Sequence, residues 1–358
     1  MTVHVPIMAS SRSEDGVVRT LIVDDSVVVR TVIERILNAD PGFSVIHKTN
    51  SAEQALGYLS EHAVDLVLLD IELPGQSGLM ALPAILRASP RTKVAILSGN
   101  CEEGSVAAVE ALALGASDIL AKPGSGSFGE QFPPALIERL SRLFNGAATP
   151  IAVRSSVPIA PEQAAELACL GIGASTGGIH ALGRLFAGLS APLGVPILLT
   201  QHLPASFTSY FAQQLGRMTF LPVKVAEQGE ILVPDTVYVA PGDASLRLRR
   251  GLHDRVFVML DPQPTSAGNL PGVDPMFASM AQAYGAAAAG VVLTGMGRDG
   301  TAGARDIVAA GGWIVAQDQP SSVVWGMPGS IAGEGLHCAL LEPHAIMDFV
   351  ARRGKNRN

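Results

Sequence analysis

Five polar residues in the first third of the 358-residue sequence could together carry out phosphoryl transfer. Asp24, Asp25 and Asp70 follow apolar runs, and Ser98 and Lys122 follow two further runs. Carboxylates that converge repel one another, so three of them call for a divalent cation with oxygen ligands. A lysine opposite them could hold the phosphoryl group, and an aspartate there can be the nucleophile. A single such acid often caps a helix, but five matching positions favour one site.

A second group of residues could perform nucleophilic catalysis. Ser175 lies in the sequence GASTGG, which fits a nucleophile elbow, where glycines permit a tight turn that exposes a serine. A serine needs a base and the base needs an orienting acid, which His202 and Asp299 could supply. Backbone N–H groups near Thr176 or Met296 could bind an oxyanion. Each residue alone has an ordinary structural explanation, so the joint arrangement carries the interpretation.

A dinucleotide-binding loop is the first alternative for the second half of the chain. Gly295, Gly297 and Gly300 have the glycine spacing of that fingerprint after an apolar run. Asp318 falls about where a ribose-binding acid is expected. Asp299 argues against this alternative, because a carboxylate inside the loop would repel a pyrophosphate.

A hydrolase with a different order of catalytic residues is the second alternative. The α/β-hydrolase order is serine, acid and histidine, so the base would be His337 or His344. The order Ser175, His202, Asp299 is different, and replacing the histidines one at a time distinguishes the two.

Short apolar runs that alternate with helical stretches predict the elements that position these residues. Runs separated by helices indicate βαβ units and parallel sheets, whose functional residues collect at the carboxyl ends of the strands. The strands expected in the first half are Leu21–Val23, Val45–His47, Val64–Leu69, Val94–Leu97 and Ser117–Leu120, with a last helix at Pro134–Phe144. Those expected in the second half are Leu167–Gly173, Pro196–Thr200, Val237–Ala240, Gly290–Thr294 and Trp313–Ala316.

An antiparallel hairpin interrupts the second α/β pattern. Leu246–Arg250 and Val256–Leu260 flank a turn that begins with glycine. Four arginines cluster on this hairpin: Arg247, Arg249, Arg250 and Arg255. They could face an acidic partner, but a solvated turn is the simpler explanation.

The fold class is therefore α/β, with two doubly wound parallel-sheet domains. The first is flavodoxin-like, and the second includes the antiparallel hairpin. We expect a disordered extension over residues 1–17, a first domain over 18–144, a linker over 145–163, a second domain over 164–352 and a tail over 353–358. The linker is rich in Ala, Pro, Ser and Val and has no clear periodicity.

Charge and composition exclude several classes of protein. Lys and Arg number 25 against 32 Asp and Glu, so the formal charge is −7 and nucleic-acid binding is disfavoured. Apolar residues make up 48% of the chain, which excludes disorder. The 3 cysteines lack the spacing of a zinc site and are an odd number, which favours a reduced cytoplasm. No signal peptide or run of about 18 apolar residues is evident, so we expect no membrane insertion.

Residues 18–144 resemble a two-component receiver domain. The matching motifs are Leu21-Ile22-Val23-Asp24-Asp25-Ser26, Leu68-Leu69-Asp70-Ile71-Glu72-Leu73-Pro74, Leu97-Ser98 and Ala121-Lys122-Pro123. The resemblance implies that Asp70 is the phosphoryl acceptor. The implied Mg²⁺ ligands are Asp24, Asp25, Asp70 and the backbone carbonyl of Glu72. Lys122 is the implied phosphate partner, and Ser98 is the implied switch hydroxyl.

Two departures from the receiver pattern concern how the signal leaves this site. The usual Asp-Gly pair after the phosphorylation loop is Ser77-Gly78 here. The aromatic switch residue three positions before the lysine is Ile119. Phosphorylation chemistry needs neither residue, but the resemblance does not extend to an aromatic rotamer relay.

Residues from about 166 to 350 resemble the catalytic domain of the chemotaxis protein-glutamate methylesterases, the CheB family. The matching segments are Gly173–Gly178, Gln201-His202, Val239–Gly242, Val273-Asp274, Leu293–Gly300, Ala316–Asp318 and Gly326–Pro328. So many motifs in one order displace the dinucleotide-binding alternative. A receiver domain in front of them is this family's architecture.

The resemblance implies hydrolysis of glutamate methyl esters on the cytoplasmic helices of chemoreceptors, with release of methanol, and deamidation of receptor glutamines. Ser175 would attack, His202 would transfer the proton and Asp299 would orient His202, with no cofactor in the esterase domain. The chemotaxis histidine kinase would phosphorylate Asp70, and the unphosphorylated receiver would cover the active site. The alternative is a regulator that binds receptors or signalling partners without hydrolysis, and the complete set of three catalytic residues argues against it.

Overall fold

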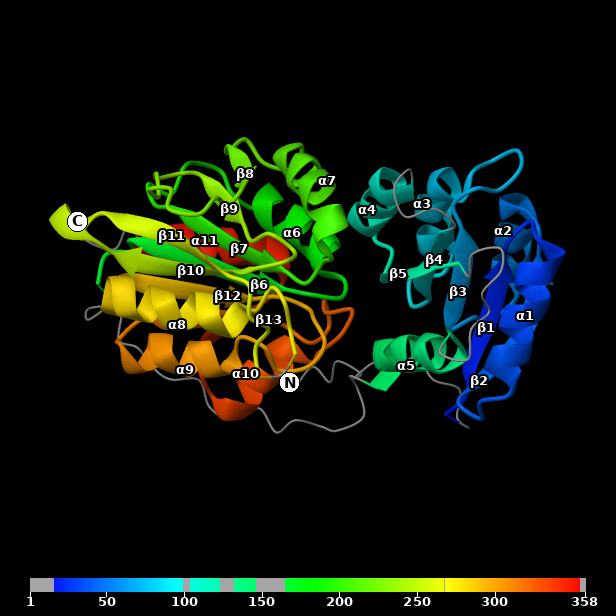
Figure 1. Cartoon of the computed structure of the whole chain (residues 1–358). Coiled ribbons are helices and arrows are strands. Elements are labelled where there is room, and N and C mark those ends of the chain that lie inside the picture. The colour runs from blue at the N-terminus through cyan, green and yellow to red at the C-terminus, as the bar shows by residue number, and fades with distance from the viewer. Residues whose placement is uncertain (1–15, 99–103, 123–131, 146–164, 267, 355–358) are drawn as a thin grey trace, which may run out of the picture. The chain divides into compact units, whose positions relative to one another are not determined.

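The computed structural model divides the chain into two units, each with helices packed on a parallel sheet (Figure 1). The division falls between Ala147 and Ala148. The residues that the structure describes are 16–98, 104–122, 132–145, 165–266 and 268–354. The expected extension, linker and tail lie almost wholly outside these ranges. Asn145, the first residue of the expected linker, is the last residue of a helix.

The first unit contains a five-stranded parallel sheet in the order β2-β1-β3-β4-β5. Its strands are β1 (Val18–Val23), β2 (Phe43–Thr49), β3 (Leu66–Asp70), β4 (Lys93–Ser98) and β5 (Asp118–Ala121). Its helices are α1 (Val27–Asn38), α2 (Ala52–Glu61), α3 (Gly78–Ala88), α4 (Gly104–Leu114) and α5 (Phe132–Asn145). The five expected strands and the last helix are confirmed with shifted ends. This flavodoxin-like order has its switch point between β1 and β3.

Buried apolar runs and serine caps explain these local structures. Every residue of β3 is buried, as its unbroken apolar run predicts for a central parallel strand. Ser26, Ser51 and Ser77 directly precede α1, α2 and α3, and each hydroxyl accepts a hydrogen bond from a backbone N–H of the first turn. Such N-caps fix where each helix begins, and therefore fix the strand ends in front of them.

The second unit contains a seven-stranded parallel sheet in the order β14-β13-β12-β6-β7-β9-β8. Its strands are β6 (Cys169–Ala174), β7 (Ile197–Gln201), β8 (Val223–Val225), β9 (Val237–Val239), β12 (Ala288–Val292), β13 (Trp313–Gln317) and β14 (His337–Leu341). Five of these correspond to expected strands. The two edge strands, β8 and β14, were not expected.

Helices cover both faces of this sheet (Figure 1). They are α6 (Gly178–Ala187), α7 (Ala205–Gly216), α8 (Val273–Tyr284), α9 (Thr301–Ala309), α10 (Met327–Glu334) and α11 (Pro343–Gly354). Helices α6 and α11 pack together on one face, and α8, α9 and α10 pack together on the other. The chain builds the sheet outward from β6 in both directions, so the switch point lies between β6 and β12.

The expected hairpin is confirmed as β10 (Ser245–Arg250) and β11 (Val256–Asp261), which pair antiparallel in a separate two-stranded sheet. Strand β10 runs alongside α8 from its beginning towards its end. The Ser245 hydroxyl accepts a hydrogen bond from the Gly272 N–H at 2.9 Å, and the Leu248 N–H donates one to the Ser279 hydroxyl at 2.9 Å. The hairpin tip is therefore carried away from the carboxyl edge of the main sheet.

The four hairpin arginines accordingly lie towards the amino edge of the main sheet. Two of them form ion pairs within the hairpin, Arg247 with Asp261 and Arg250 with Asp254. This position and pairing agree with the simpler explanation, a solvated turn, and separate the arginines from the edge that carries Ser175.

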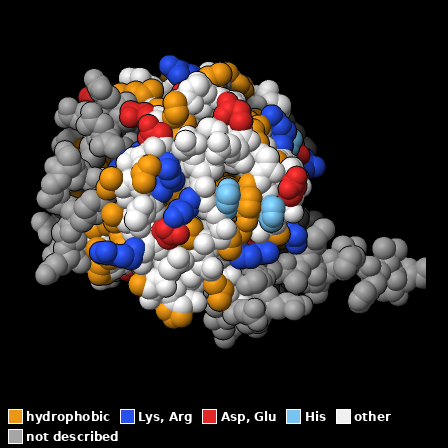
Figure 2. Space-filling model, turned by 90° about the vertical axis from the view of Figure 1, so that its right-hand side faces the viewer, with side chains coloured by type: hydrophobic (Ala, Val, Ile, Leu, Met, Phe, Trp, Pro, Cys, Tyr) orange, Lys and Arg blue, Asp and Glu red, His pale blue; other side chains and the backbone are white. Residues whose placement is uncertain are grey.

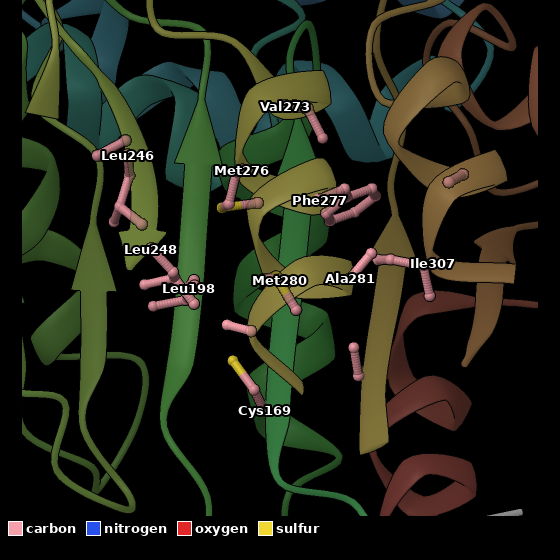
Figure 3. Close-up of a cluster of buried hydrophobic side chains, with 14 of the residues drawn as sticks. Cys169, Leu198, Leu246, Leu248, Val273, Met276, Phe277, Met280, Ala281 and Ile307 are labelled. Carbon is pink, nitrogen blue, oxygen red and sulfur yellow. The ribbon is translucent and has the colours of Figure 1, made fainter. Parts of the chain in front are cut away.

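Glycines let α8 approach the centre of the main sheet closely. A Cβ atom at Gly171 would lie 2.5 Å from the Met280 sulfur, and one at Gly173 would lie 2.5 Å from Val273 Cγ1. Figure 3 shows Val273, Phe277 and Met280 on α8 within the cluster of buried apolar side chains. Because no other side chain fits at these strand positions, the glycines set the distance between α8 and β6.

Charged side chains are mixed by sign on the face of the molecule drawn in Figure 2. Lys and Arg side chains there lie among Asp and Glu side chains and do not merge into one continuous basic surface. Within the described ranges, every helix is too short or too polar to span a lipid bilayer.

We expect Gly173→Ala to destabilise the second unit, because its methyl group would press on the stiff, branched side chain of Val273. Overpacking of this kind costs about 1–3 kcal/mol in free energy of unfolding. Both tryptophans of the chain, Trp313 and Trp325, belong to this unit, so denaturant unfolding followed by tryptophan fluorescence reports on it alone. The control is Gly216→Ala, whose nearest neighbour would be 4.0 Å away. Equal stability of the two variants would contradict the packing argument.

Candidate functional site

Three carboxylates meet at the switch point of the first sheet. Asp24 follows β1 and Asp70 ends β3, and oxygen atoms of Asp24, Asp25 and Asp70 all lie within 4.8 Å of one another. Asp24 and Asp70 are buried, whereas Asp25 is exposed. Lys122, which follows β5, places its Nζ atom 2.8 Å from Asp24 Oδ2 and 2.6 Å from Asp70 Oδ2. The structure thus brings together the three acids and the lysine that the sequence singled out.

Burial and charge act in opposite directions on the pKa values of this pocket. Burial raises the pKa of Asp70, and the ammonium group of Lys122 offsets only part of that effect. Burial alone would lower the pKa of Lys122, but its contacts with Asp24 and Asp70 outweigh burial and raise it. A single lysine therefore does not compensate the acids, because the charge of Asp24 also raises the pKa of Asp70.

The donor set of this pocket fits a magnesium ion. The buried Oδ2 atoms of Asp24 and Asp70 contact Lys122 and, among the residues that the structure describes, accept no other hydrogen bond. Within the described part of the chain, the backbone carbonyl of Glu72 accepts no hydrogen bond, and the Glu72 N–H donates to Asp70 Oδ1 at 3.1 Å. Carboxylate and carbonyl oxygens are the hard ligands that Mg²⁺ prefers.

The neighbouring loops hold Asp70 in place. The Ser77 hydroxyl accepts from the Met80 N–H at 3.3 Å, so serine at this position still caps α3. A Cβ atom at Gly78 would lie 1.9 Å from the Asp70 carbonyl oxygen, so only glycine fits there.

Ser98 is half-buried at the end of β4, and its carbonyl accepts from the Lys122 N–H at 2.6 Å. Ile119 lies on β5, half-buried.

The second constellation lies at the switch point of the second sheet. Ser175, His202 and Asp299 follow the three adjacent strands β6, β7 and β12 at their carboxyl ends. His202 Nε2 lies 2.8 Å from Asp299 Oδ2. The His202 N–H donates to the Ala174 carbonyl at 3.1 Å, which ties the histidine backbone to the residue before Ser175. Ser175 and His202 are half-buried, so both remain accessible.

Asp299 is buried and accepts several hydrogen bonds. Its Oδ2 accepts from the Val273 N–H at 2.8 Å, and its Oδ1 accepts from the N–H groups of Asp274 and Gly300, both at 3.0 Å. Burial alone would raise the pKa of Asp299, but the bond with His202 and these backbone donors outweigh it and lower the pKa. Asp299 is therefore held as a carboxylate, able to orient His202 and to stabilise its protonated ring.

The turn that carries Ser175 is fixed from three sides. The Ser175 carbonyl accepts from the Gly178 N–H at 2.7 Å and from Gln201 Nε2 at 2.9 Å. The Ser175 N–H donates to the Thr294 carbonyl at 3.1 Å. Gly177 has a φ of 75°, a left-handed conformation that favours glycine. The serine is thus held in a rigid turn in front of α6.

Two backbone donors beside Ser175 are free. Within the described residues, the N–H groups of Thr176 and Met296 donate no hydrogen bond in the protein. Thr176 is next to Ser175, and Met296 follows Gly295, where a Cβ atom would lie 2.8 Å from Ser175 Cβ. Unpaired N–H groups so close to a serine can stabilise an oxyanion.

The structure does not favour the histidines of the α/β-hydrolase order. His337 is the first residue of β14 and is buried, so it lies at the amino edge of the sheet, opposite Ser175. Burial lowers the pKa of His337, which keeps its ring neutral. His344 lies in the first turn of α11, where its carbonyl oxygen would be 2.0 Å from a Cβ at Gly188.

The glycine loop of the dinucleotide alternative is filled by the protein itself. The Gly295 carbonyl accepts from the N–H groups of Gly326 and Met327, at 3.1 and 2.8 Å. A Cβ atom at Gly295 would lie 2.4 Å from the Met327 sulfur. Gly295 therefore permits close packing of the chain beside Ser175, and its carbonyl is occupied by Gly326 and Met327, which argues against a pyrophosphate site in this loop.

Sequence reasoning assigned no role to three supporting features of the second site. Gln201 braces the serine turn, the backbone of Val273 and Asp274 binds Asp299, and the Gln317 side chain accepts from the Thr294 N–H at 2.8 Å. The motifs Gln201-His202, Val273-Asp274 and Ala316–Asp318 could have indicated from the sequence that these residues matter. Which residue each one contacts could not be predicted, because the contacts join segments that are distant in sequence.

Both units are similar to known protein families. The family model described as CheB methylesterase matches residues 170–350, and the response regulator receiver domain matches residues 20–127. The protein-glutamate methylesterase/protein-glutamine glutaminase 2 of Caulobacter vibrioides is 39% identical over 345 residues, covering 94% of this chain and 99% of its own. An enzyme of the same name, numbered 4, from Anaeromyxobacter dehalogenans is 40% identical over 321 residues, covering 87% and 88%.

Among solved structures, the CheB methylesterase catalytic domain of Thermotoga maritima is similar to the second unit. It matches with a TM-score of 0.51 at 36% identity, covering 52% of this chain and 99% of that domain. Fold and comparisons together define a response regulator whose output unit is an α/β methylesterase domain. The chain belongs to the CheB family of receiver-linked methylesterases.

Proposed function

We propose that this protein removes methyl esters from glutamate side chains of chemoreceptors, releases methanol, and deamidates receptor glutamines. Relatives that align over most of this chain and are named protein-glutamate methylesterase/protein-glutamine glutaminase support both activities. The observation that carries the proposal is the 2.8 Å contact between His202 Nε2 and the buried carboxylate of Asp299, on strands adjacent to the strand before Ser175. This arrangement supplies a nucleophile, a base and an orienting acid.

In the proposed mechanism, the Ser175 hydroxyl attacks the ester carbonyl and His202 accepts its proton. Because Nε2 faces Asp299, Nδ1 is the ring nitrogen left for this transfer. The proton then passes to methoxide, which leaves as methanol, and water hydrolyses the acyl-serine by the same route. Asp299 stabilises the imidazolium throughout. The N–H groups of Thr176 and Met296 hold the oxyanion, each worth about 3–4 kcal/mol of transition-state stabilisation.

Deamidation follows the same steps with a different leaving group. Ser175 attacks the glutamine amide, His202 delivers the proton to nitrogen, and ammonia leaves in place of methanol. Hydrolysis of the acyl-serine then gives glutamate. One set of residues thus serves both substrates, because both reactions pass through a tetrahedral oxyanion.

The first unit regulates this activity through phosphorylation of Asp70. A carboxylate oxygen of Asp70 attacks the phosphorus of a phosphohistidine on the chemotaxis histidine kinase, and the histidine leaves. Lys122 pairs with the transferred phosphoryl group and Ser98 bonds to it. A Mg²⁺ ion bound by Asp24, Asp25, Asp70 and the Glu72 carbonyl would neutralise charge during the transfer. We expect the protein to work in the cytoplasm on receptor helices, without inserting into the membrane or binding nucleic acid.

Ser175→Ala should abolish methanol release from methylated receptors, with a loss of about 10⁴-fold or more, because no other group replaces the nucleophile. The measurement is methanol formed from a methylated receptor. Ser209→Ala, on the exposed surface of α7, should retain activity, and His337→Gln should also retain it. Release undiminished in Ser175→Ala would contradict the mechanism. Receptor binding by the wild type without any methanol would favour the non-hydrolytic regulator.

Asp70→Asn should prevent activation by a small-molecule phosphodonor and leave basal esterase activity intact, because the amide cannot accept a phosphoryl group as the carboxylate does. The measurement is the ratio of methanol release with and without acetyl phosphate. Chelating divalent cations should give the same unstimulated ratio in the wild type. If Asp70→Asn is activated as strongly as the wild type, the regulatory assignment is wrong.

A further inference from the structure

Two carboxylates accept hydrogen bonds from the first turns of α8 and α9, and each comes from outside the helix that it caps. Asp299 stands just before α9, yet its side chain accepts from the Val273 and Asp274 N–H groups at the start of α8. Asp274 belongs to α8, yet its Oδ1 accepts at 2.8 Å from the N–H of Gly303, in the first turn of α9. The first N–H groups of a helix have no partner within it. The start of α8 is thus capped by the acid just before α9, and the start of α9 is capped by an acid of α8.

Close packing fixes this exchange. A Cβ atom at Gly303 would lie 2.6 Å from the Asp274 carbonyl oxygen and 2.6 Å from Phe277 Cβ. Phe277 lies in the buried cluster under α8 (Figure 3). Since no side chain fits at position 303, the first turn of α9 lies directly against α8. The side chain of Asp274 is therefore held between two helix ends.

Charged groups near Asp274 lie in the loop before α9 and on α9 itself. Asp299 faces it from the loop before α9, and His202 lies beyond Asp299. From α9 comes Arg305, whose guanidinium group is bound to Glu334 of α10. Burial raises the pKa of Asp274, the N–H groups of α9 offset part of this, and the negative charge of Asp299 raises it further. Asp274 is thus a second acid directly behind the acid that contacts His202.

We propose that Asp274 is a positioning residue for the esterase reaction: it holds the start of α9, and so Asp299, against α8, and its charge stabilises the imidazolium that forms at His202 during the reaction. The role rests on the proposed function of Ser175, His202 and Asp299. Asp274 contacts no substrate and acts only through Asp299. An imidazolium forms at His202 when the serine is deprotonated, so a second negative charge nearby lowers the free energy of that state.

Two substitutions separate the two parts of this role. Asp274→Asn keeps an oxygen that can accept from the Gly303 N–H but removes the charge. Asp274→Ala removes both the oxygen and the charge. Asp306→Asn is the matched control, because Asp306 is an exposed acid on α9, the helix whose first turn Asp274 caps. If Asp274→Asn fails to fold, Asp274→Ser replaces it, since a serine hydroxyl is also a neutral cap.

The test is the pH profile of methanol release by the full chain. Asp274→Asn should move the acid limb of kcat/KM to lower pH by about 0.5–1 pH unit, because a nearby negative charge is lost, and Asp306→Asn should not move it. Asp274→Ala should in addition reduce kcat by about 10-fold or more, because it also removes the cap of α9.

Superimposable pH profiles of Asp274→Asn and the wild type would overturn the proposal and leave Asp274 as a helix cap only. Equal shifts of the profile in Asp274→Asn and Asp306→Asn would also overturn it, because the effect would then be one of net charge. Ser175→Ala tests the proposed function separately. If that variant retained methanol release, the proposed function would fail, whereas superimposable profiles beside an inactive Ser175→Ala would overturn only the role of Asp274.

Discussion

The second unit depends on the burial of one carboxylate, that of Asp299. An unpaired charge at 3% exposure would be strongly destabilising, so every oxygen lone pair available to it must be used. Three backbone N–H groups and the His202 ring meet this need. Those donors converge only if α8 begins beside β12, which in turn requires glycine at positions 171 and 173. The same bonds that make the fold stable therefore aim the histidine at the edge that carries Ser175.

Both units use the same feature of parallel sheets with different chemistry. In each, the switch point brings loops from adjacent strands together at the carboxyl edge. The first unit fills this place with acids and one cation, Lys122, so it suits a metal and a phosphoryl group. The second fills it with a neutral serine turn and a single buried acid, which suits acyl transfer. Burial raises the pKa of Asp70, whereas hydrogen bonding lowers that of Asp299.

The sequence predicts most of the fold because the central strands are unbroken apolar runs between capped helices. It misses β8 and β14, which are edge strands whose residues, apart from the buried His337, are only partly buried and therefore give a weak apolar signal. The residues at strand ends were predictable from topology alone, since parallel strands share one carboxyl edge. The contacts of Gln201 and Asp274 were not, because Gln201 joins the ends of two neighbouring strands and Asp274 joins two helices, and both pairs of elements are distant in sequence.

In the proposed mechanism, Ser175 is a nucleophile that the His202–Asp299 pair activates. The most direct measurement is reaction of the full chain with a fluorophosphonate, which phosphonylates activated serines with loss of fluoride, followed by mass spectrometry of the digested protein. The expected result is one adduct, on the peptide that contains Ser175. Labelling should be slower by about 10²-fold or more in His202→Gln, because that variant has lost the base. An adduct on a different serine, or equal labelling rates in His202→Gln and the wild type, would contradict it.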